Sequence, residues 1–502
     1  MQYTDLNTAL EALKKIQDTH YVYRHTMEIV SIDAATAAPE NSVEGRGKVM
    51  EMFSGLSYQL IADPANLDLI AFLKAHDGLL TQAQRRQVAL FKRDSQQISR
   101  IPQEEYVAYN VLINEADAIW KKAKANNDFA SFAPTLQKIV DFNRKFAGYY
   151  NPNVPAYDAL LNEFEEGMTQ PILDEFFGEL RKTIVPLIQA VGEKPEIDSS
   201  FLCRHYPAEK QREFSQYLMD VIGIDKTRCT LAETEHPFTG GPNNHDVRIT
   251  THYYENAVHS SMYSVIHEGG HAIYDMGCDD AYNYTFLYGG VSMGIHESQS
   301  RFYENLIGRS RAFVELVFPK MQELFPEQLA DVSPEMMYRA VNKARPSLIR
   351  TEADELTYCM HVMVRYEMEK QLIAGTLKIE DVPKEWNRLY KEYLGVDVPS
   401  DSQGCLQDTH WAGGMIGYFP SYALGSAYGA QMKSVMEQEI GNIEDLISKG
   451  EIGKITAWLH EHIHRHGSLY KPGELFEMCC GKFDAKYFTD YLTEKYTKLY
   501  NL

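Results

Sequence analysis

His267 and His271 stand four residues apart in the segment His267-Glu268-Gly269-Gly270-His271, and this spacing is the clearest chemical signal in the 502-residue chain. On an α-helix, residues at i and i+4 lie one turn apart on the same face, so both imidazoles can bind one metal ion. Glu268 projects beside that metal, where its carboxylate can accept a proton from a water molecule that the metal activates. Gly277 and the apolar residues at helical intervals before it predict a helix here (Val258, Met262, Val265, Ile266 and Ile273).

Two adjacent glycines, Gly269 and Gly270, lie inside this predicted helix. Each glycine lowers helix stability by about 1 kcal/mol relative to alanine. A sequence that keeps this cost needs the room that the missing side chains leave. We expect that room to serve, for instance, a substrate backbone that passes close to the helix.

A catalytic zinc site needs a third protein ligand and one open coordination position. Glu297, 26 residues beyond His271, is the best candidate, because the gap fits the end of one helix, a loop and the start of another. The pair Gly289-Gly290 marks the loop, and the second helix is predicted from about residue 297 to residue 307.

Other residues could fill the same role. His259, His296 and Asp275 are alternative third ligands. Asp275 lies four residues after His271 on the same helix face, so it is better placed to orient an imidazole from behind. Glu297 could equally be an ordinary acidic residue at a helix N-terminus, where the helix dipole favours negative charge. Spacing alone leaves these alternatives open.

Five further segments match one known family in type and in order. They are His236-Pro237-Phe238, Asp246-Val247-Arg248-Ile249-Thr250, His296-Glu297-Ser298-Gln299, Ile349-Arg350-Thr351-Glu352-Ala353-Asp354 and Gly404-Cys405-Leu406-Gln407-Asp408-Thr409-His410-Trp411. Together with the paired histidines, these segments make the chain resemble the carboxypeptidase Taq family of metallopeptidases. The resemblance extends from about residue 20 to the C-terminus.

This resemblance implies a zinc-dependent carboxypeptidase that removes single residues from the free C-terminus of peptides with broad specificity. It makes His267, His271 and Glu297 the ligands of one Zn2+ per chain and Glu268 the general base. Two nitrogens and a carboxylate also accept Co2+ or another divalent ion. The implied fold is all-α, with two lobes around a deep substrate groove and a small β-sheet near the active site. That architecture is like neurolysin and angiotensin-converting enzyme, and family members are typically homodimers.

Peptide hydrolysis also needs hydrogen-bond donors for the oxyanion. Tyr422 and His410 are the predicted donors, with Tyr418 behind them. They lie in a segment that resembles the His/Tyr region of related helical zinc peptidases. Because the chain has 32 tyrosines, a packing role for Tyr418 is a strong alternative.

The carboxylate of a C-terminal residue is bound better by the planar fork of arginine than by lysine. Arg350 and Arg248 both lie in family-like segments and are the two candidates. We favour Arg350, because it falls in a helix predicted from about residue 349 to residue 372, which would hold it rigidly.

Helical patterns continue through the chain without a linker, repeat or low-complexity tract. The length alone would suggest about three domains. The patterning instead predicts one catalytic unit over residues 1–502, with two lobes around a groove. Examples of predicted helices are residues 6–30, 81–99, 104–126, 170–191 and 485–500, and the few strand candidates include residues 247–254 and 229–232.

Composition excludes several partners. A net charge of −21 argues against nucleic acid and anionic membrane surfaces. The sequence has no run of 18 apolar residues that would span a membrane, and residues 1–5 lack the features of a signal peptide. The seven cysteines show no paired metal-ligand spacing and indicate reduced thiols, so we expect a cytoplasmic protein.

Two other kinds of protein fit the same metal motif. An oligoendopeptidase or a dipeptidyl carboxypeptidase of this architecture would use the same chemistry, and only the position of the carboxylate-binding arginine separates these enzymes. A non-catalytic peptide-binding protein would keep the metal, but it would have no chemical need for Glu268.

Overall fold

The structure is a computed structural model that describes residues 3–502, and it confirms a mainly helical fold with one small sheet. A π-helix (Phe302–Gly308) directly follows the α-helix α11 (Met293–Arg301). The α-helices are α1 (Leu6–Thr36), α2 (Val43–Ala62), α3 (Ala65–Ala75), α4 (Gln82–Arg100), α5 (Gln103–Asn126), α6 (Phe129–Tyr150), α7 (Ala156–Phe164), α8 (Gln170–Gly192), α9 (Ala208–Val221), α10 (Val258–Gly277), α11 (Met293–Arg301), α12 (Arg311–Leu324), α13 (Pro334–Val341), α14 (Glu355–Ala374), α15 (Val382–Leu394), α16 (Pro420–Ile440), α17 (Ile443–Ser448), α18 (Ile452–His462), α19 (Pro472–Cys480) and α20 (Lys486–Tyr500).

The sheet has three strands, β1 (Cys229–Glu233), β2 (Thr239–Asn243) and β3 (Asp246–Thr251), in the order β1-β3-β2. β1 runs parallel to β3, and β2 runs antiparallel to it. Both predicted strand regions are present. The edge strand β2 escapes prediction because its sequence, Thr-Gly-Gly-Pro-Asn, is poor in strand-forming residues.

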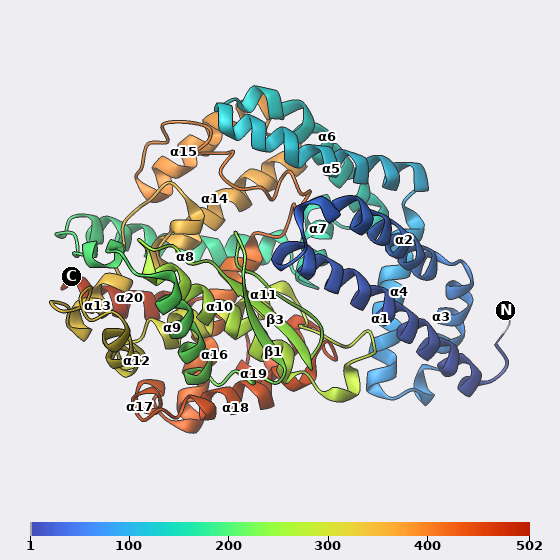
Figure 1. Cartoon of the computed structure of the whole chain (residues 1–502). Helices are drawn as coiled ribbons and strands as arrows, with labels where there is room; N and C mark the ends of the chain where they lie inside the picture. Colours follow the sequence, from blue (N-terminus) through green and yellow to red (C-terminus); the bar gives the residue numbers. More distant parts are fainter. Residues whose placement is uncertain (1–2) are drawn as a thin grey trace.

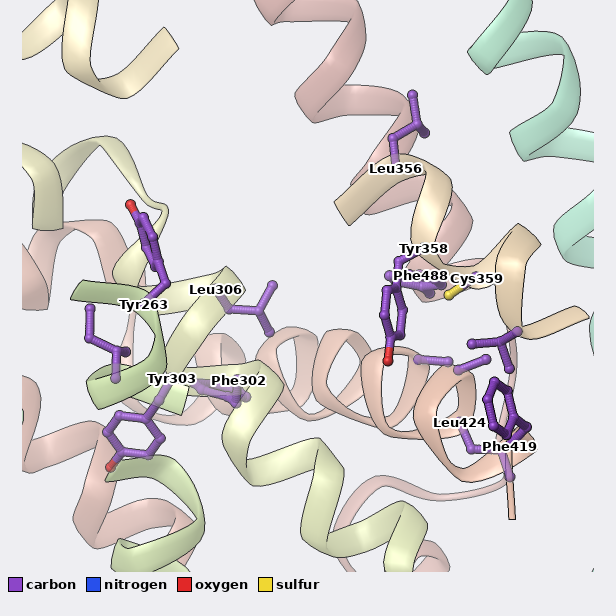
Figure 2. Close-up of a cluster of buried hydrophobic side chains, with 14 of the residues drawn as sticks. Tyr263, Phe302, Tyr303, Leu306, Leu356, Tyr358, Cys359, Phe419, Leu424 and Phe488 are labelled. Carbon is purple, nitrogen blue, oxygen red and sulfur yellow. The ribbon is translucent and has the colours of Figure 1, made fainter. Parts of the chain in front are cut away.

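Two clusters of buried apolar side chains hold the helices together. The larger cluster runs through most of the molecule from α5 to α20, and Figure 2 shows part of it around α16 and the π-helix. The smaller cluster joins α1, α2, α3 and α4, which lie together on one side of the molecule (Figure 1). α1 also packs against β2, so this group of helices borders the sheet edge.

α10 and α11 pack closely because Gly270 has no side chain. A Cβ atom at Gly270 would lie 2.8 Å from the Ser300 Cα atom and 2.8 Å from the Gln299 carbonyl oxygen, both on α11. A Cβ atom at Gly269 would meet the side chains of Ile222 and Ile224 instead. The expectation of room for a substrate backbone is therefore wrong, because neighbouring parts of the protein itself fill the space at both glycines.

The helix that carries Glu297 begins earlier than predicted. Ser292 caps α11, with its side chain accepting a hydrogen bond from the Ile295 amide at 3.1 Å, and Glu297 lies within the helix rather than at its N-terminus. The interpretation of Glu297 as an ordinary helix N-terminal acid is therefore wrong. The π-helix then carries the chain on to Gly308.

The helix predicted over residues 349–372 also differs. Asp354 caps α14 by accepting a hydrogen bond from the Thr357 amide, so the helix begins at Glu355. Arg350 lies before it in a short 3-10 helix (Arg350–Glu352). The long-helix argument for choosing Arg350 is therefore wrong, and its rigidity must come from its contacts.

Among the described residues, no helix combines the length and hydropathy that crossing a membrane requires.

The contact at Gly270 makes a first prediction. We expect Gly270→Ala to lower the free energy of unfolding by about 1–3 kcal/mol, because the new methyl group would press on the backbone of α11. The helix propensity of alanine returns only about 1 kcal/mol. Chemical denaturation measures the change, and metal titration of the folded variant would show weaker binding as α11 moves.

Gly269→Ala is the matched control. Its nearest neighbours would be the terminal Cδ1 atoms of Ile222 and Ile224, which can move aside. We expect a smaller loss of stability than for Gly270→Ala. Equal losses in the two variants would contradict the importance of the backbone contact.

Candidate metal centre

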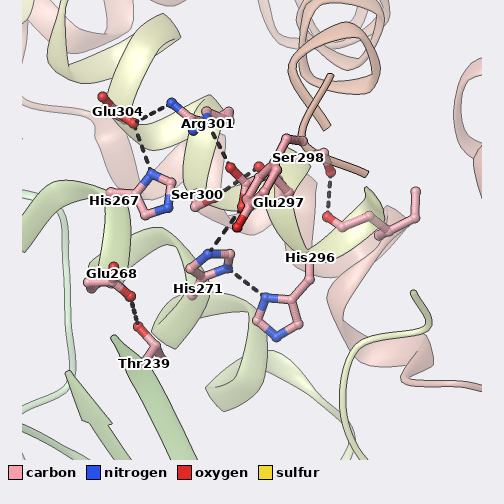
Figure 3. Close-up of polar contacts among 12 residues, drawn as sticks. Thr239, His267, Glu268, His271, His296, Glu297, Ser298, Ser300, Arg301 and Glu304 are labelled. Carbon is pink, nitrogen blue, oxygen red and sulfur yellow. Dashed lines mark hydrogen bonds and ion pairs between the residues drawn. The ribbon is translucent and has the colours of Figure 1, made fainter. Parts of the chain in front are cut away.

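Three potential ligand atoms meet between α10 and α11. His267 and His271 lie one turn apart on α10, and Glu297 lies on α11. One nitrogen or oxygen atom from each residue lies within 4.8 Å of those of the other two. Figure 3 shows the two rings and the carboxylate facing a common centre. The structure thus brings together the three residues that the sequence analysis names as ligands.

A chain of hydrogen bonds fixes the ring of His271. Its Nδ1 atom lies 2.6 Å from Nδ1 of His296, and Nε2 of His296 lies 3.0 Å from the Asp275 carboxylate. In the neutral tautomer of His296 that donates Nε2–H to Asp275, Nδ1 of His296 accepts a hydrogen bond from Nδ1–H of His271. The Nε2 atom of His271 is then an unprotonated lone pair, directed toward Glu297 at 3.6 Å.

The alternative ligands lie elsewhere. His296 stands behind His271 as its hydrogen-bond partner, and Asp275 acts on His271 only through His296. His259 is half-buried near Arg309, and its removal from water together with that positive charge lowers its pKa to about 4. None of the three belongs to the group of facing ligand atoms found among residues 3–502.

Glu304 fixes the ring of His267. Its carboxylate lies 2.9 Å from Nδ1 of His267, so the ring presents Nε2 to the other ligands. Glu304 also accepts hydrogen bonds from Arg301 at 3.2 Å and Arg309 at 3.1 Å. Although burial alone would raise the pKa of Glu304, these two guanidinium groups and His267 hold it well below its usual range. Glu304 is therefore an anion at neutral pH.

Arg301 connects the two acidic residues of the site. Its Nε atom donates to Glu297 at 2.7 Å, and its Nη1 atom donates to Glu304. The second carboxylate oxygen of Glu297 faces His271. Two imidazole nitrogens whose rings are oriented by hydrogen bonds, together with one carboxylate oxygen, form a donor set that suits zinc or a similar divalent ion, so these residues fit a metal.

Glu268 lies on α10 between the two histidines and points toward the sheet (Figure 3). The Thr239 hydroxyl, on the edge strand β2, donates to one Glu268 oxygen at 2.6 Å. Only 8% of Glu268 is exposed, and burial raises the pKa of its carboxyl group. A raised carboxyl pKa lies closer to neutral pH, which favours a group that both accepts and returns a proton.

His410, Tyr418 and Tyr422 form a second polar cluster. Nε2 of His410 lies 3.3 Å from the Tyr422 hydroxyl, and the rings of Tyr418 and Tyr422 meet edge to face with centroids 5.0 Å apart. Burial lowers the pKa of His410 to about 3, raises the pKa of Tyr418 to about 12 and also raises the pKa of Tyr422. All three side chains are therefore neutral at pH 7 and can donate hydrogen bonds.

Arg350 lies beside this cluster. Its Nε and Nη2 atoms each donate to Asp408 at 2.9 Å, and its Nη1 atom donates to the Tyr358 hydroxyl at 2.9 Å. The guanidinium carbon lies 5.0 Å from the centre of the Tyr422 ring. Arg350 is 7% exposed, so contacts on several sides hold it even though no long helix carries it.

Arg248, the other candidate clamp, is on β3 and pairs with Asp246 at 2.8 Å. Its side chain is about one-third exposed. Among the described residues, none of its hydrogen bonds or ion pairs reaches the metal ligands or the His410 cluster. The structure therefore does not bring Arg248 together with the other candidate site residues.

Sequence reasoning missed Thr239, Arg301, Glu304 and Tyr358. Arg301 and Glu304 follow Glu297 at i+4 and i+7, a helical spacing that could have revealed them. Tyr358 lies on α14, where its ring faces the Arg301 guanidinium at 4.2 Å. No local pattern marks Tyr358 or Thr239, because both reach the site from distant segments.

Paired histidines on one helix, a facing acid and a buried glutamate define a metallopeptidase of the His-Glu-x-x-His class. Residues 12–496 match the family model described as carboxypeptidase Taq (M32) metallopeptidase, so the chain belongs to this family. The predicted resemblance is confirmed. The chain is therefore a peptide hydrolase of the metallocarboxypeptidase type that acts with a divalent metal.

Curated relatives and solved structures agree with this assignment. Carboxypeptidase 1 of Bacillus subtilis is 40% identical over 484 residues, covering 96% of each chain. Thermostable carboxypeptidase 1 of Pyrococcus furiosus is 35% identical, covering 94% of this chain and 95% of the relative. The crystal structure of an M32 carboxypeptidase from Deinococcus radiodurans superposes with a TM-score of 0.95 at 36% identity, covering 99% of this chain and 100% of the other.

The Glu304 contacts make the second prediction. We expect Glu304→Gln to weaken metal binding about 10- to 100-fold, because the amide is a poorer partner for His267 and leaves Arg301 and Arg309 without a facing charge. Competition with a chromophoric chelator measures the affinity. Asp275→Asn, which acts on His271 only through His296, serves as the comparison and should have a smaller effect. Unchanged affinity in Glu304→Gln would contradict the role of Glu304.

Proposed function

We propose that this metallocarboxypeptidase uses zinc, held by His267, His271 and Glu297, and releases single C-terminal residues from peptides with broad specificity. The observation that carries the proposal is the group of three facing ligand atoms within 4.8 Å, beside the buried Glu268. Bound zinc would lower the pKa of a water molecule to about 7 and polarise the scissile carbonyl.

Glu268 is the proposed general base. Its carboxylate accepts a proton from the attacking water and returns it to the amine that leaves. The hydrogen bond from Thr239 occupies one oxygen and holds the carboxylate in place, so the other oxygen can face the substrate. Burial of Glu268 favours this exchange, because it raises the pKa of the carboxyl group.

Tyr422 and His410 are the proposed donors to the oxyanion, with Tyr418 packed behind them. Their neutral state supports the role, because each keeps a proton to donate without adding a full charge. A donor at such a position contributes about 3–4 kcal/mol to transition-state stabilisation. The hydrogen bond between Tyr422 and His410 holds the two side chains next to each other.

Arg350 is the proposed ligand of the substrate carboxylate. A guanidinium group has five N–H donors, of which Asp408 takes two and Tyr358 takes one. One N–H remains on each terminal nitrogen, which is the fork that binds a carboxylate in two places. Arg248 is the less favoured candidate, because its hydrogen bonds and ion pair reach only Asp246 and none of them leads to the metal ligands or the His410 cluster.

Several further features belong to the same proposal. One ion per chain is proposed, with zinc preferred and Co2+ possible in the same donor set. The whole chain is proposed to act as one unit with two lobes, and as a homodimer. A cytoplasmic location is supported by the cysteines, all of which are free thiols among the described residues.

The third prediction tests the type of cleavage. A peptide with a blocked N-terminus and a free C-terminus should yield a ladder of single-residue losses by mass spectrometry. The same peptide with a C-terminal amide should resist cleavage, because the amide removes the carboxylate that Arg350 binds. Losses in pairs would favour a dipeptidyl carboxypeptidase, and internal cuts would favour an oligoendopeptidase.

The fourth prediction separates catalysis from metal binding. We expect Glu268→Gln to lower kcat by at least about 100-fold, because the amide cannot accept the proton. Metal content, measured by elemental analysis, should match that of the unmodified protein, since Glu268 is not a proposed ligand. Removal of the metal with a chelator should abolish activity in the unmodified protein. A protein that cleaves no peptide of a library in the presence of zinc would instead favour the peptide-binding alternative.

A further inference from the structure

Glu369 is a fully buried carboxylate on α14, outside the metal centre and the His410 cluster. Four groups donate to it. Oε1 accepts from Nε of Arg365 and Nε1 of Trp411, each at 3.0 Å. Oε2 accepts from the Tyr157 hydroxyl at 3.1 Å and the Gly417 amide at 2.8 Å. Since a carboxylate offers about four acceptor positions, Glu369 is completely engaged.

Two of these donors lie in the segment that carries the second polar cluster. Trp411 directly follows His410, and Gly417 directly precedes Tyr418. This segment lies between α15 and α16 and has no regular helix or strand before α16 begins at Pro420. Its own backbone hydrogen bonds are those of short turns, such as Gly414 to Trp411 and Met415 to His410, and Glu369 adds two fixed points from outside.

Gly417 shows how tightly this fixing is done. Its backbone has φ of +96°, a conformation that favours glycine, and a Cβ atom there would lie 3.0 Å from the Leu160 carbonyl carbon on α7. The Gly417 amide is thus held between the backbone of α7 and the Glu369 carboxylate. The position of Tyr418, and of Tyr422 one turn later, depends on this contact.

Arg365 completes the arrangement. Its guanidinium carbon lies 3.8 Å from the centre of the Trp411 ring and 4.5 Å from that of Phe419. Its Nη1 and Nη2 atoms have no hydrogen-bond partner among the described residues, so its contacts are the Glu369 carboxylate and two aromatic faces. Both rings belong to the same segment, so Arg365 contacts that segment as well as Glu369.

We propose that Glu369 is a positioning residue for the hydrolysis, which sets the geometry of His410 and Tyr422 through Trp411 and Gly417. Its hydrogen bonds reach none of the proposed metal ligands. The proposal rests on the roles given above to His410 and Tyr422. Loss of a buried ion pair with a purely structural role would lower only the stability of the protein. Loss of a positioning residue must also change the rate of the chemical step.

Glu369→Gln tests this proposal, because it keeps the shape but places an NH2 group opposite two of the four donors. We expect kcat to fall about 10- to 100-fold, as for a small displacement of catalytic groups. KM should change less than about 3-fold, because Asp408 still holds Arg350. Metal content should be unchanged. An unchanged kcat in the folded variant would overturn the proposal.

A double-mutant cycle with Tyr422→Phe measures whether the effects of the two substitutions on kcat are coupled. A purely structural role of Glu369 would give no such coupling. If Glu369 acts through Tyr422, Glu369→Gln should lower kcat by less than about 3-fold in the Tyr422→Phe background, where the hydroxyl is absent. The same fold-loss in both backgrounds would overturn the proposal. If Tyr422→Phe alone keeps full kcat, the role proposed for Tyr422 is wrong, and the positioning of that residue falls with it.

Two further variants keep the test decisive. If Glu369→Gln does not fold, Trp411→Phe removes one donor but keeps the Arg365–Glu369 pair and an aromatic ring. We expect it to lower kcat about 3- to 10-fold and to show the same dependence on Tyr422. Glu355→Gln is the matched control, since Glu355 is a buried acid on the same helix, paired with Lys495 at 2.5 Å. It should lower Tm but leave kcat within about 2-fold, and an equal loss of kcat in this control would overturn the proposal.

Discussion

Buried charge is the constraint on which the rest of this structure depends. Glu297, Glu304 and Asp408 are each less than 10% exposed, and each must keep a negative charge away from water. Arg301 donates to the first two carboxylates, and Arg350 donates to the third. Leaving a buried charge without its partner costs about 3–5 kcal/mol, so the helices that carry these side chains cannot shift independently. These ion pairs therefore hold the metal ligands in fixed positions.

Close packing of the helices also brings the site residues together. Gly270 lets the backbone of α11 approach α10, and Gly425 does the same for α16, where a Cβ atom would lie 2.7 Å from the Glu297 Cβ atom. Glu297 is thus confined between two helices by the absence of side chains around it. Close approach also excludes water, which strengthens the electrostatic interactions inside the site.

The sequence predicts the local parts of this site well and the long-range parts poorly. Helical periodicity was sufficient for α5 and α8, whose bounds differ from the predicted ones by one residue at one end, and for the pairing of His267 with His271. It failed at α14, because a helix buried on all sides has no polar face to mark where it begins. Capping by Asp354, rather than apolar spacing, decides that boundary.

The resemblance to a family identified the segments that contain Arg350 and His410. It could not predict which residues these two side chains contact. Asp408 lies 58 residues after Arg350, and their pairing depends on how α15 and the segment after it fold back on α14. Glu304 was within reach of helical spacing from Glu297, whereas Thr239 lies on a strand that no propensity marks. What the sequence leaves out is therefore the set of contacts between segments distant in the chain.

Tyr358 shows how the two halves of the site are joined. Its ring lies 4.2 Å from the guanidinium carbon of Arg301, which holds the metal ligand Glu297, and its hydroxyl accepts a hydrogen bond from Arg350. One side chain therefore contacts both the arginine of the metal centre and the arginine proposed to bind substrate. In the proposed reaction, Glu297 holds the metal and Arg350 holds the substrate carboxylate, so the spacing between the two arginines affects where the peptide lies relative to the metal. A rigid aromatic ring with two fixed contacts maintains this spacing with little loss of conformational entropy, since tyrosine has only two side-chain torsions to restrict.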